Sequence, residues 1–587
     1  METRIECHEE FIVRIVPNFR RQAWFPGVWP VRSMLAVAAC FVALSAFAQP
    51  QWRHIYAETN SAPGSRQPNE YSRAVALDKA ENVFVAATTY GPKITLLKLS
   101  ASGELLWARH FTGPRFSGAS ADSLALDGNG SAYVVGTIGT GTGEDLVIIK
   151  YDPDGNLIWT ASFDYSGGRE NPAAIALDLL ANVYVTGQRD DAYGHSVAIT
   201  VKFNSRGQQL WSAVYEGRRP GFHAGQALAV DAFGNAYITG YTGGDILTVK
   251  YDAAGRQVWA RRHNGTPGLG DAGLAIVADP LGQVYVAGVS EARGNRQEWI
   301  TLKYSNTGQL RWAKRRNGGN SLGGATAIVR DAQGDVYVTG GGGAVVKYSA
   351  VGRKVWESVG PGGTPGTPMR LQLDAQGFLY YALTDFSPPN GGYFHVGQIE
   401  PACGERLWTA SLIEDQPRSD HVAAMAVAPS GSLVVSGSSV AEDSDVTTVK
   451  FQPPDHRDTP RVSVSAVDPI AIEGAQGESA LGVFKVWRTG PTNEPLVVGF
   501  LATGTAKPGL DYLPALQDGF GIVTIPAGFN YALIPIRPVN DRIWERTETV
   551  RLTIYRGSDV FGRYLIGPYR EAVVRILNND LRIFSND

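Results

Sequence analysis

Eight tryptophans recur at nearly even intervals along the chain, and this spacing constrains its fold more than any other feature. The intervals run from 44 to 55 residues, and the positions are Trp52, Trp107, Trp159, Trp211, Trp259, Trp312, Trp356 and Trp408. Each tryptophan ends a similar sequence motif, which we call the repeat phrase. In one repeat the phrase begins at Ala176-Leu177-Asp178, continues through 182–187 and 200–207, and ends at Trp211. A chain with this period must be built from repeated units of similar structure.

Each repeat contains four strand-like runs. The first ends in an aspartate, at Asp78, Asp127, Asp178, Asp231, Asp279, Asp331 and Asp374. The second is a Tyr-Val or Phe-Val run, most often ending in glycine. The third ends in a Lys–aromatic pair such as Lys150-Tyr151, and the fourth begins at the tryptophan. A glycine soon after the third run indicates a tight hairpin. Four short strands in a period of about 40–50 residues are typical of a β-propeller.

The two ends of the repeat region complement each other. The last repeat, 422–451, has three runs and no tryptophan segment, whereas 51–56 is a fourth-strand segment without a repeat of its own. Pairing them would close the ring and leave no open edge. We therefore predict an all-β protein with an eight-bladed β-propeller over 49–451, closed by the strand 51–56. Seven blades remain the alternative, because the sixth and seventh repeats are irregular.

The first 48 residues have the pattern of an export leader. An apolar run from Met34 to Ala48 follows several arginines and ends in an Ala-x-Ala cleavage pattern. Translation from Met34 and lipidation at Cys40 stay open as alternatives. We expect a secreted, periplasmic or cell-surface protein whose mature chain has no integral membrane span. Removal of the leader leaves Cys403 as the one cysteine of three, which excludes an internal disulfide.

A second domain follows the repeats. Residues 452–461 form a polar, proline-rich linker, and 462–582 carry a different set of strand-like runs. These runs are 462–467, 481–488, 496–502, 521–525, 532–538, 549–555 and 572–577. Seven short strands in this length predict an antiparallel β-sandwich.

Acidic residues of this second domain lie in the turns between its strands. Hard oxygen ligands on loops at one end of a sandwich suit calcium. The pattern, from Ile472-Glu473-Gly474 to Asn578-Asn579-Asp580, resembles the Calx-beta domain. That resemblance implies calcium ligands at Glu473, Asp511, Asp541, Glu545 and Asp580. Asn540, Asn578 and Asn579 stand where strong binders carry Asp, so we expect a weak site. The alternative is that Glu473 and Asp511 only brace turns.

The repeat phrase resembles the beta-propeller repeats of secreted bacterial proteins, which implies secretion and binding rather than a known reaction. We interpret the repeated Asp, Trp and Lys as fold residues. The acidic loop 152–156 is interpreted as a hairpin turn rather than a calcium loop. Basic residues follow three successive tryptophans, at Arg218-Arg219, Arg261-Arg262-His263 and Lys314-Arg315-Arg316. We interpret these charges as protection of the outer strands against unwanted pairing with other strands. Docking of an anionic polymer is the alternative.

No motif of a known catalytic site occurs in the sequence. The nine histidines are scattered, and a net charge of −3 argues against a nucleic-acid partner. We predict a secreted or cell-surface, non-enzymatic binding or scaffold protein whose partner is a protein or a cell-envelope polymer. The main alternative is a periplasmic quinoprotein-like dehydrogenase, since eight-bladed propellers with such a tryptophan phrase resemble that class. An outer-membrane assembly scaffold is a further alternative.

Overall fold

The computed structural model describes residues 50–57, 70–89, 91–113, 118–140, 143–165, 167–191, 193–217, 221–265, 270–292, 296–317, 323–358, 369–386, 392–412, 419–440, 444–456, 458–474, 480–514, 516–540, 546–556 and 563–578. Within these ranges the chain is built of strands and one short 3-10 helix, η2 (Gln517–Gly519). None of the described helical residues forms a segment long and apolar enough to cross a membrane.

The described part of residues 50–451 forms eight four-stranded antiparallel sheets. The first four are β2 (Tyr71–Leu77), β3 (Val83–Thr89), β4 (Lys93–Leu99) and β5 (Leu105–Phe111); β6 (Ala119–Leu126), β7 (Ala132–Gly139), β8 (Glu144–Tyr151) and β9 (Leu157–Phe163); β10 (Arg169–Leu177), β11 (Val183–Asp190), β12 (Ser196–Phe203) and β13 (Gln209–Tyr215); β14 (His223–Val230), β15 (Ala236–Thr242), β16 (Asp245–Tyr251) and β17 (Gln257–His263). The next three are β18 (Asp271–Ala278), β19 (Val284–Ala292), β20 (Arg296–Tyr304) and β21 (Leu310–Asn317); β22 (Ala325–Arg330), β23 (Val336–Gly340), β24 (Val345–Tyr348) and β25 (Lys354–Ser358); β26 (Arg370–Leu373), β27 (Leu379–Asp385), β28 (Tyr393–Ile399) and β29 (Arg406–Leu412). The last combines β30 (Ser419–Val427), β31 (Leu433–Val440) and β32 (Ser444–Phe451) with β1 (Pro50–Tyr56).

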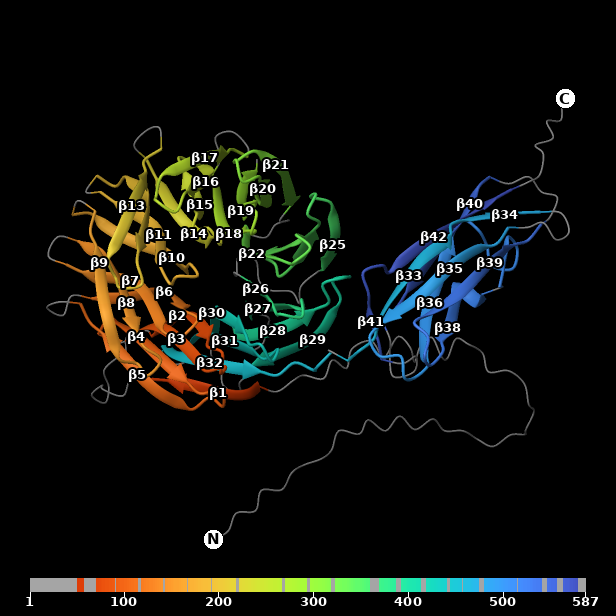
Figure 1. Ribbon diagram of the computed structural model, residues 1–587, viewed down its shortest axis with the longest axis horizontal. Helices are drawn as coiled ribbons and strands as arrows, with labels where there is room; N and C mark the ends of the chain where they lie inside the picture. The colour runs from red at the N-terminus through yellow and green to blue at the C-terminus, as the bar shows by residue number, and fades with distance from the viewer. Residues whose placement is uncertain are drawn as a thin grey trace, which may run out of the picture. The chain divides into compact units, whose positions relative to one another are not determined.

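The sheets follow one another around a common centre, and the arrangement resembles a propeller (Figure 1). The first strand of each sheet lies innermost and contacts the first strand of the next, from β2 through β30 and back to β2. The middle strands are buried because apolar residues cover both of their faces. In β11, for example, 183–187 are all buried.

The first and last sheets are joined directly. β1 pairs with β32 in antiparallel register, so the segment expected at 51–56 supplies the fourth strand of the last sheet. The indole Nε1 of Trp52 donates a hydrogen bond to the carbonyl oxygen of Ala101, 2.9 Å away in the sheet β2–β5. The Nζ of Lys450 on β32 lies 3.3 Å from the carboxylate of Glu81, which lies between β2 and β3 of that first sheet. These contacts tie the end of the repeat region to its beginning.

The predicted structural roles of the repeated Asp, Trp and Lys are confirmed. Asp178 Oδ1 accepts the backbone N–H groups of Leu180 and Asn182, at 3.0 and 2.9 Å. Trp159 Nε1 donates to the carbonyl oxygen of Ser205 in the next sheet, at 3.1 Å. The Nζ of Lys98 donates to the carbonyl oxygen of Pro153 in the next sheet, at 2.8 Å. The same three patterns recur at Asp78, Asp127, Asp231, Asp279 and Asp374, at Trp107, Trp211, Trp259, Trp312 and Trp356, and at Lys202, Lys303 and Lys347.

The hairpin glycines permit this packing. Gly155 has a φ of 81°, and a Cβ atom there would lie 2.8 Å from the indole ring of Trp107. A glycine is therefore needed both for the left-handed backbone and for the close approach of the indole.

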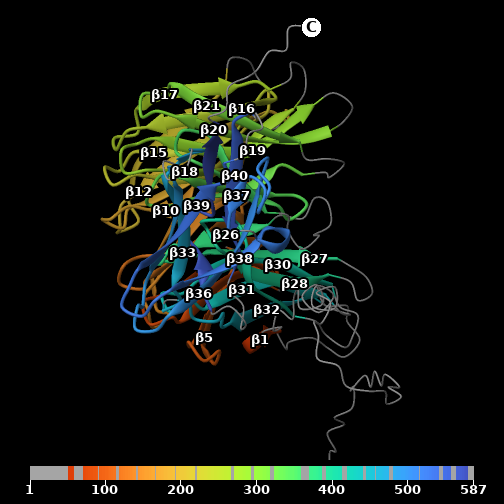
Figure 2. The same cartoon turned by 90° about the vertical axis from the view of Figure 1, so that its right-hand side faces the viewer.

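The rest of the described chain forms two five-stranded sheets, drawn in blue in Figures 1 and 2. One has the order β37 (Tyr512–Leu513), β39 (Tyr531–Pro538), β35 (Gly482–Thr489), β33 (Arg461–Asp468) and β41 (Leu565–Ile566). The other has the order β34 (Ile470–Ile472), β42 (Glu571–Leu577), β40 (Glu548–Ile554), β36 (Leu496–Gly504) and β38 (Phe520–Ile525). The two share one apolar core, with Val486 and Ile534 from the first and Val498 and Val550 from the second. All seven runs expected here are strands; β34, β37 and β41 are short and were not predicted.

Candidate binding surface and candidate calcium ligands

Large apolar side chains are exposed on the turns between the first and second strands of three successive sheets. The exposed fractions are 88 % for Leu179, 77 % for Leu180, 74 % for Phe233 and 74 % for Leu281. These turns follow β10, β14 and β18. We call these four side chains the apolar turn surface.

The same turns of the other sheets carry smaller or polar residues. They are Lys79-Ala80, Gly128-Asn129, Ala332-Gln333, Ala375-Gln376 and Pro429-Ser430. Because the backbone of the turn is common to the repeats, the fold does not require leucine or phenylalanine at these places. Single exposed apolar residues are ordinary, but their concentration on consecutive turns makes these four side chains candidates for an interaction surface.

Each turn is rigid because the aspartate before it binds the backbone. Asp231 Oδ1 accepts the N–H groups of Phe233 and Asn235, both at 2.9 Å. Asp279 Oδ1 does the same for Leu281 and Gln283, at 2.9 and 2.8 Å. The apolar side chains are thus presented on fixed supports, which lowers the entropy lost on binding.

Two tyrosines place the three turns beside one another. The Tyr184 hydroxyl lies 3.1 Å from Asp178 Oδ2 in its own sheet and 3.0 Å from the carbonyl oxygen of Gly234 in the next. The Tyr237 hydroxyl donates to Asp231 Oδ2 at 2.9 Å, and a Cβ atom on Gly282 would lie 2.8 Å from it. Burial, followed by the neighbouring carboxylates, raises the pKa of both phenols, so they stay protonated donors.

The arginines after two of these tryptophans, Arg261, Arg262, Arg315 and Arg316, bind groups within the protein. Arg262 Nη2 lies 2.8 Å from Asp245 Oδ2, and Arg316 Nε lies 2.8 Å from Glu357 Oε1. Arg261 Nε donates to the carbonyl oxygen of Gly308 at 2.7 Å. Arg218 and Arg219 lie outside the described residues. These pairings favour a structural role over docking of an anionic polymer.

Two of the five predicted calcium ligands lie in the described chain. Glu473 is buried, and its Oε2 accepts a hydrogen bond from Asn578 Nδ2 at 3.0 Å. Asp511 Oδ2 accepts the Lys507 N–H at 2.6 Å. Both carboxylates therefore bind groups of neighbouring turns. Asp541, Glu545 and Asp580 lie outside the described residues, so the sandwich calcium site stays a prediction.

The acidic loop 152–156 is a hairpin turn, as predicted. Asp152 Oδ1 accepts the N–H groups of Asp154 and Asn156, at 3.0 and 2.8 Å. The carbonyl oxygen of Pro153 accepts a hydrogen bond from Lys98 of the preceding sheet at 2.8 Å. The loop is thus part of the contact between sheets.

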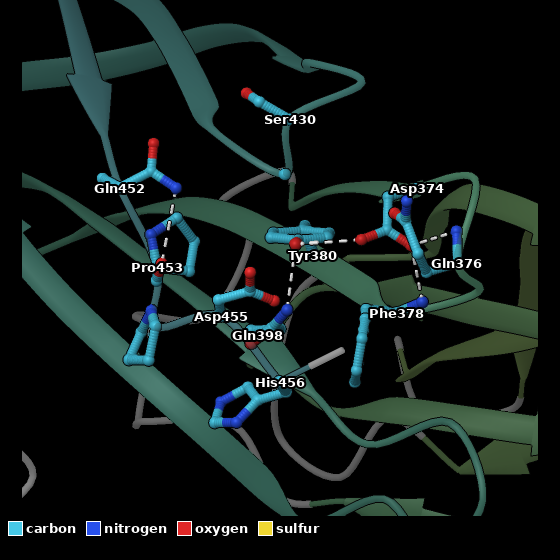
Figure 3. A pocket seen from close by; sticks show the side chains of 12 residues that line it. Asp374, Gln376, Phe378, Tyr380, Gln398, Ser430, Gln452, Pro453, Asp455 and His456 are labelled. Carbon is cyan, nitrogen blue, oxygen red and sulfur yellow. Dashed lines mark hydrogen bonds between the residues drawn. The ribbon is translucent and has the colours of Figure 1, made fainter. Parts of the chain in front are cut away.

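A small hollow lies beside the segment that leaves β32 (Figure 3). The Tyr380 hydroxyl donates to Asp374 Oδ2 at 3.0 Å and accepts from Gln398 Nε2 at 2.9 Å. His456 lies at its edge, and burial lowers the pKa of this imidazole. Asp374, Tyr380 and Gln398 thus form one chain of hydrogen bonds beside the hollow.

The sequence prediction did not identify the apolar turn surface. A signal was present: two leucines follow Asp178, where the other repeats carry at most one large apolar residue. Comparing the repeats residue by residue at this turn would have located the surface.

The chain is similar to known proteins in part of its length. A family model described as beta-propeller repeat matches residues 225–248. No curated protein matches the chain. Among solved structures, the C-terminal WD40 domain of Sif2 matches with 10 % identity and a TM-score of 0.42, covering 67 % of this chain and 100 % of that one. The apo-form Calx CBD1 domain matches with 18 % identity and a TM-score of 0.17, covering 20 % of this chain and 99 % of that one. CBD12 from CALX1.2 matches with the same identity and TM-score, covering 20 % of this chain and 46 % of that one.

Proposed function

We propose that this chain is a secreted or cell-surface binding protein without enzymatic activity. In this proposal its eight four-stranded sheets are the blades of a closed eight-bladed propeller, and residues 1–48 direct its export. The apolar turn surface binds a protein partner. The observation that supports this most directly is the exposure of Leu179, Leu180, Phe233 and Leu281 on three adjacent, rigid turns.

The chemistry of the surface favours a protein partner over a cell-envelope polymer. Four large aliphatic or aromatic side chains offer apolar area to be buried, which drives protein association. An anionic polymer would instead need unpaired cationic side chains. Arg262 and Arg316, two of the basic residues that could serve it, already bind carboxylates.

The two C-terminal sheets fit the role of a spacer. We propose that 462–582 form a Calx-beta-type sandwich that binds calcium weakly through Glu473, Asp511, Asp541, Glu545 and Asp580. A bound ion would join loops of this domain and stiffen it.

The test compares capture by matched variants. A triple variant, Leu180→Ser, Phe233→Ser and Leu281→Ser, removes apolar groups from the surface. The control, Lys79→Ser, Gln333→Ser and Gln376→Ser, changes equivalent turns of other sheets. The wild type is immobilised and exposed to envelope extract of the producing cell, and each protein that it captures is purified and titrated against the wild type and both variants.

We expect the wild type and the control to bind the partner equally and the triple variant to bind at least ten-fold more weakly, with unchanged thermal stability. Equal binding by all three would contradict the assigned surface. Dye reduction that depends on added pyrroloquinoline quinone would contradict the absence of enzymatic activity.

A further inference from the structure

Three carboxylates converge where the sheet β6–β9 meets the sheet β10–β13. Asp145 lies on β8, Asp164 directly follows β9, and Glu170 lies on β10 of the next sheet. One carboxylate oxygen from each residue lies within 4.8 Å of the other two. Ligands at about 2.4 Å from a central ion are separated by up to about twice that distance, so the spacing suits a single cation.

Glu170 is the buried member of this cluster. Its exposed fraction is 0 %, and its Oε1 accepts the Tyr165 N–H at 3.3 Å. Its Oε2 is also buried and has no hydrogen-bond partner within the described part of the chain. A buried carboxylate oxygen without a partner is costly unless a proton or a cation neutralises it.

The equivalent place two sheets later contains its own cation. Asp245 on β16 and Asp271 on β18 repeat two of the acidic positions. There the guanidinium of Arg262 binds Asp245, with Nε at 3.0 Å and Nη2 at 2.8 Å from Oδ2. The protein therefore supplies an internal positive charge at that junction.

Strand register identifies the residue that replaces this arginine. Lys150 pairs with Trp159 as Lys250 pairs with Trp259, and Val147 pairs with Ser162 as Leu247 pairs with Arg262. Ser162 thus occupies the arginine position beside the three carboxylates. Compared with its counterpart, this junction has a further carboxylate, Asp164, and lacks the arginine of β17, while Arg189 on β11 is the register partner of Glu170.

We propose that Asp145, Asp164 and Glu170 bind a hard divalent cation, calcium, between these two sheets. The ligands are all carboxylates, which select calcium or magnesium over metals that prefer nitrogen or sulfur. They come from three separate segments and range from buried to exposed, and calcium accepts such irregular geometry more readily than magnesium does. The ion would fasten neighbouring sheets together.

The charges around Glu170 agree with this assignment. Burial, followed by Asp164 and Asp145, raises its pKa to about 7, against the Tyr165 N–H and Arg189, which lower it. Arg189 lies over the ring of Tyr165, and the flanking Arg169 pairs with Glu144 at 2.8 Å.

The experiment is a calorimetric titration of the purified full chain, freed of metal, with calcium chloride and separately with magnesium chloride. Glu170→Gln removes the buried ligand. Ser162→Arg installs the cation found at the equivalent junction. Asp271→Asn is the matched control, and Glu473→Gln monitors the separate site proposed in the sandwich. Circular dichroism and thermal melts establish that each variant folds.

We expect the wild type and Asp271→Asn to bind calcium at this site and to melt several degrees higher in saturating calcium. Glu170→Gln and Ser162→Arg should each lose one equivalent of bound calcium, and Ser162→Arg should remain stable without it. Glu473→Gln should leave this equivalent intact. Unchanged calcium stoichiometry in folded Ser162→Arg and Glu170→Gln would overturn the proposal, as would a wild type that binds no calcium or prefers magnesium.

Discussion

The hydroxyl group of Tyr184 lies 3.0 Å from the carbonyl oxygen of Gly234 and donates to it across the boundary between two sheets. The same hydroxyl lies 3.1 Å from Asp178 Oδ2, so one buried tyrosine holds two neighbouring turns. These turns carry Leu179, Leu180 and Phe233. Packing between sheets therefore fixes the spacing of the side chains that we assign to partner binding.

Replacing Tyr184 by Phe should reduce the free energy of unfolding by about 1–3 kcal/mol, because buried acceptors lose their donor. Urea denaturation measures this difference. Tyr193→Phe is the control: its side chain is 87 % exposed, and the substitution should change stability by less than about 0.5 kcal/mol. Equal stability of the two variants would show that the tyrosine bridge has no structural importance.

The packing of the indoles can be separated from backbone strain with two glycines. Gly155 and Gly194 share a φ of 81°, but only at Gly155 would a Cβ atom meet a described neighbour, the Trp107 ring at 2.8 Å. Gly155→Ala should therefore be less stable than Gly194→Ala by about 1–3 kcal/mol, measured by thermal and chemical denaturation. Similar losses would mean that the ring of Trp107 moves aside freely.

A buried histidine should make the protein sensitive to acid. His395 is 8 % exposed, and burial lowers its pKa to about 4, with Arg406 lowering it further and Asp385 opposing. Its two ring nitrogens lie 3.2 Å from the Tyr381 hydroxyl and 2.8 Å from the Ser411 hydroxyl. The unfolded chain takes up the proton near pH 6.5, so stability is full above that pH and is lost as pH falls towards 4.

This contribution amounts to about 3 kcal/mol. Denaturant titrations from pH 7.5 to 4 should show a flatter profile for His395→Gln than for the wild type. A profile of unchanged slope would show that another group governs the acid sensitivity.

Much of the fold could be predicted because its determinants repeat. Seven aspartates precede the same turn, and seven of the eight tryptophans donate to a carbonyl oxygen in the next sheet, whereas the Trp408 indole N–H has no hydrogen-bond partner within the described residues. The strand β1 could be predicted because the last repeat lacks its fourth strand. The short strands β34, β37 and β41 could not be predicted, because two or three residues carry no periodicity. Similarly, the convergence of Asp145, Asp164 and Glu170 depends on contact between two sheets, which spacing along the chain does not reveal.

The proposed closed propeller requires that β1 and β32 join the two ends of the ring. An engineered disulfide between these two strands tests this closure directly. His54 and Thr448 are register partners, so cysteines at these two positions lie within bonding distance. The control places cysteines at 54 and 449, whose side chains point to opposite faces. After mild oxidation of the folded proteins, peptide mapping should find the 54–448 disulfide and no 54–449 disulfide. A folded 54/448 variant that stays reduced would contradict the closed ring.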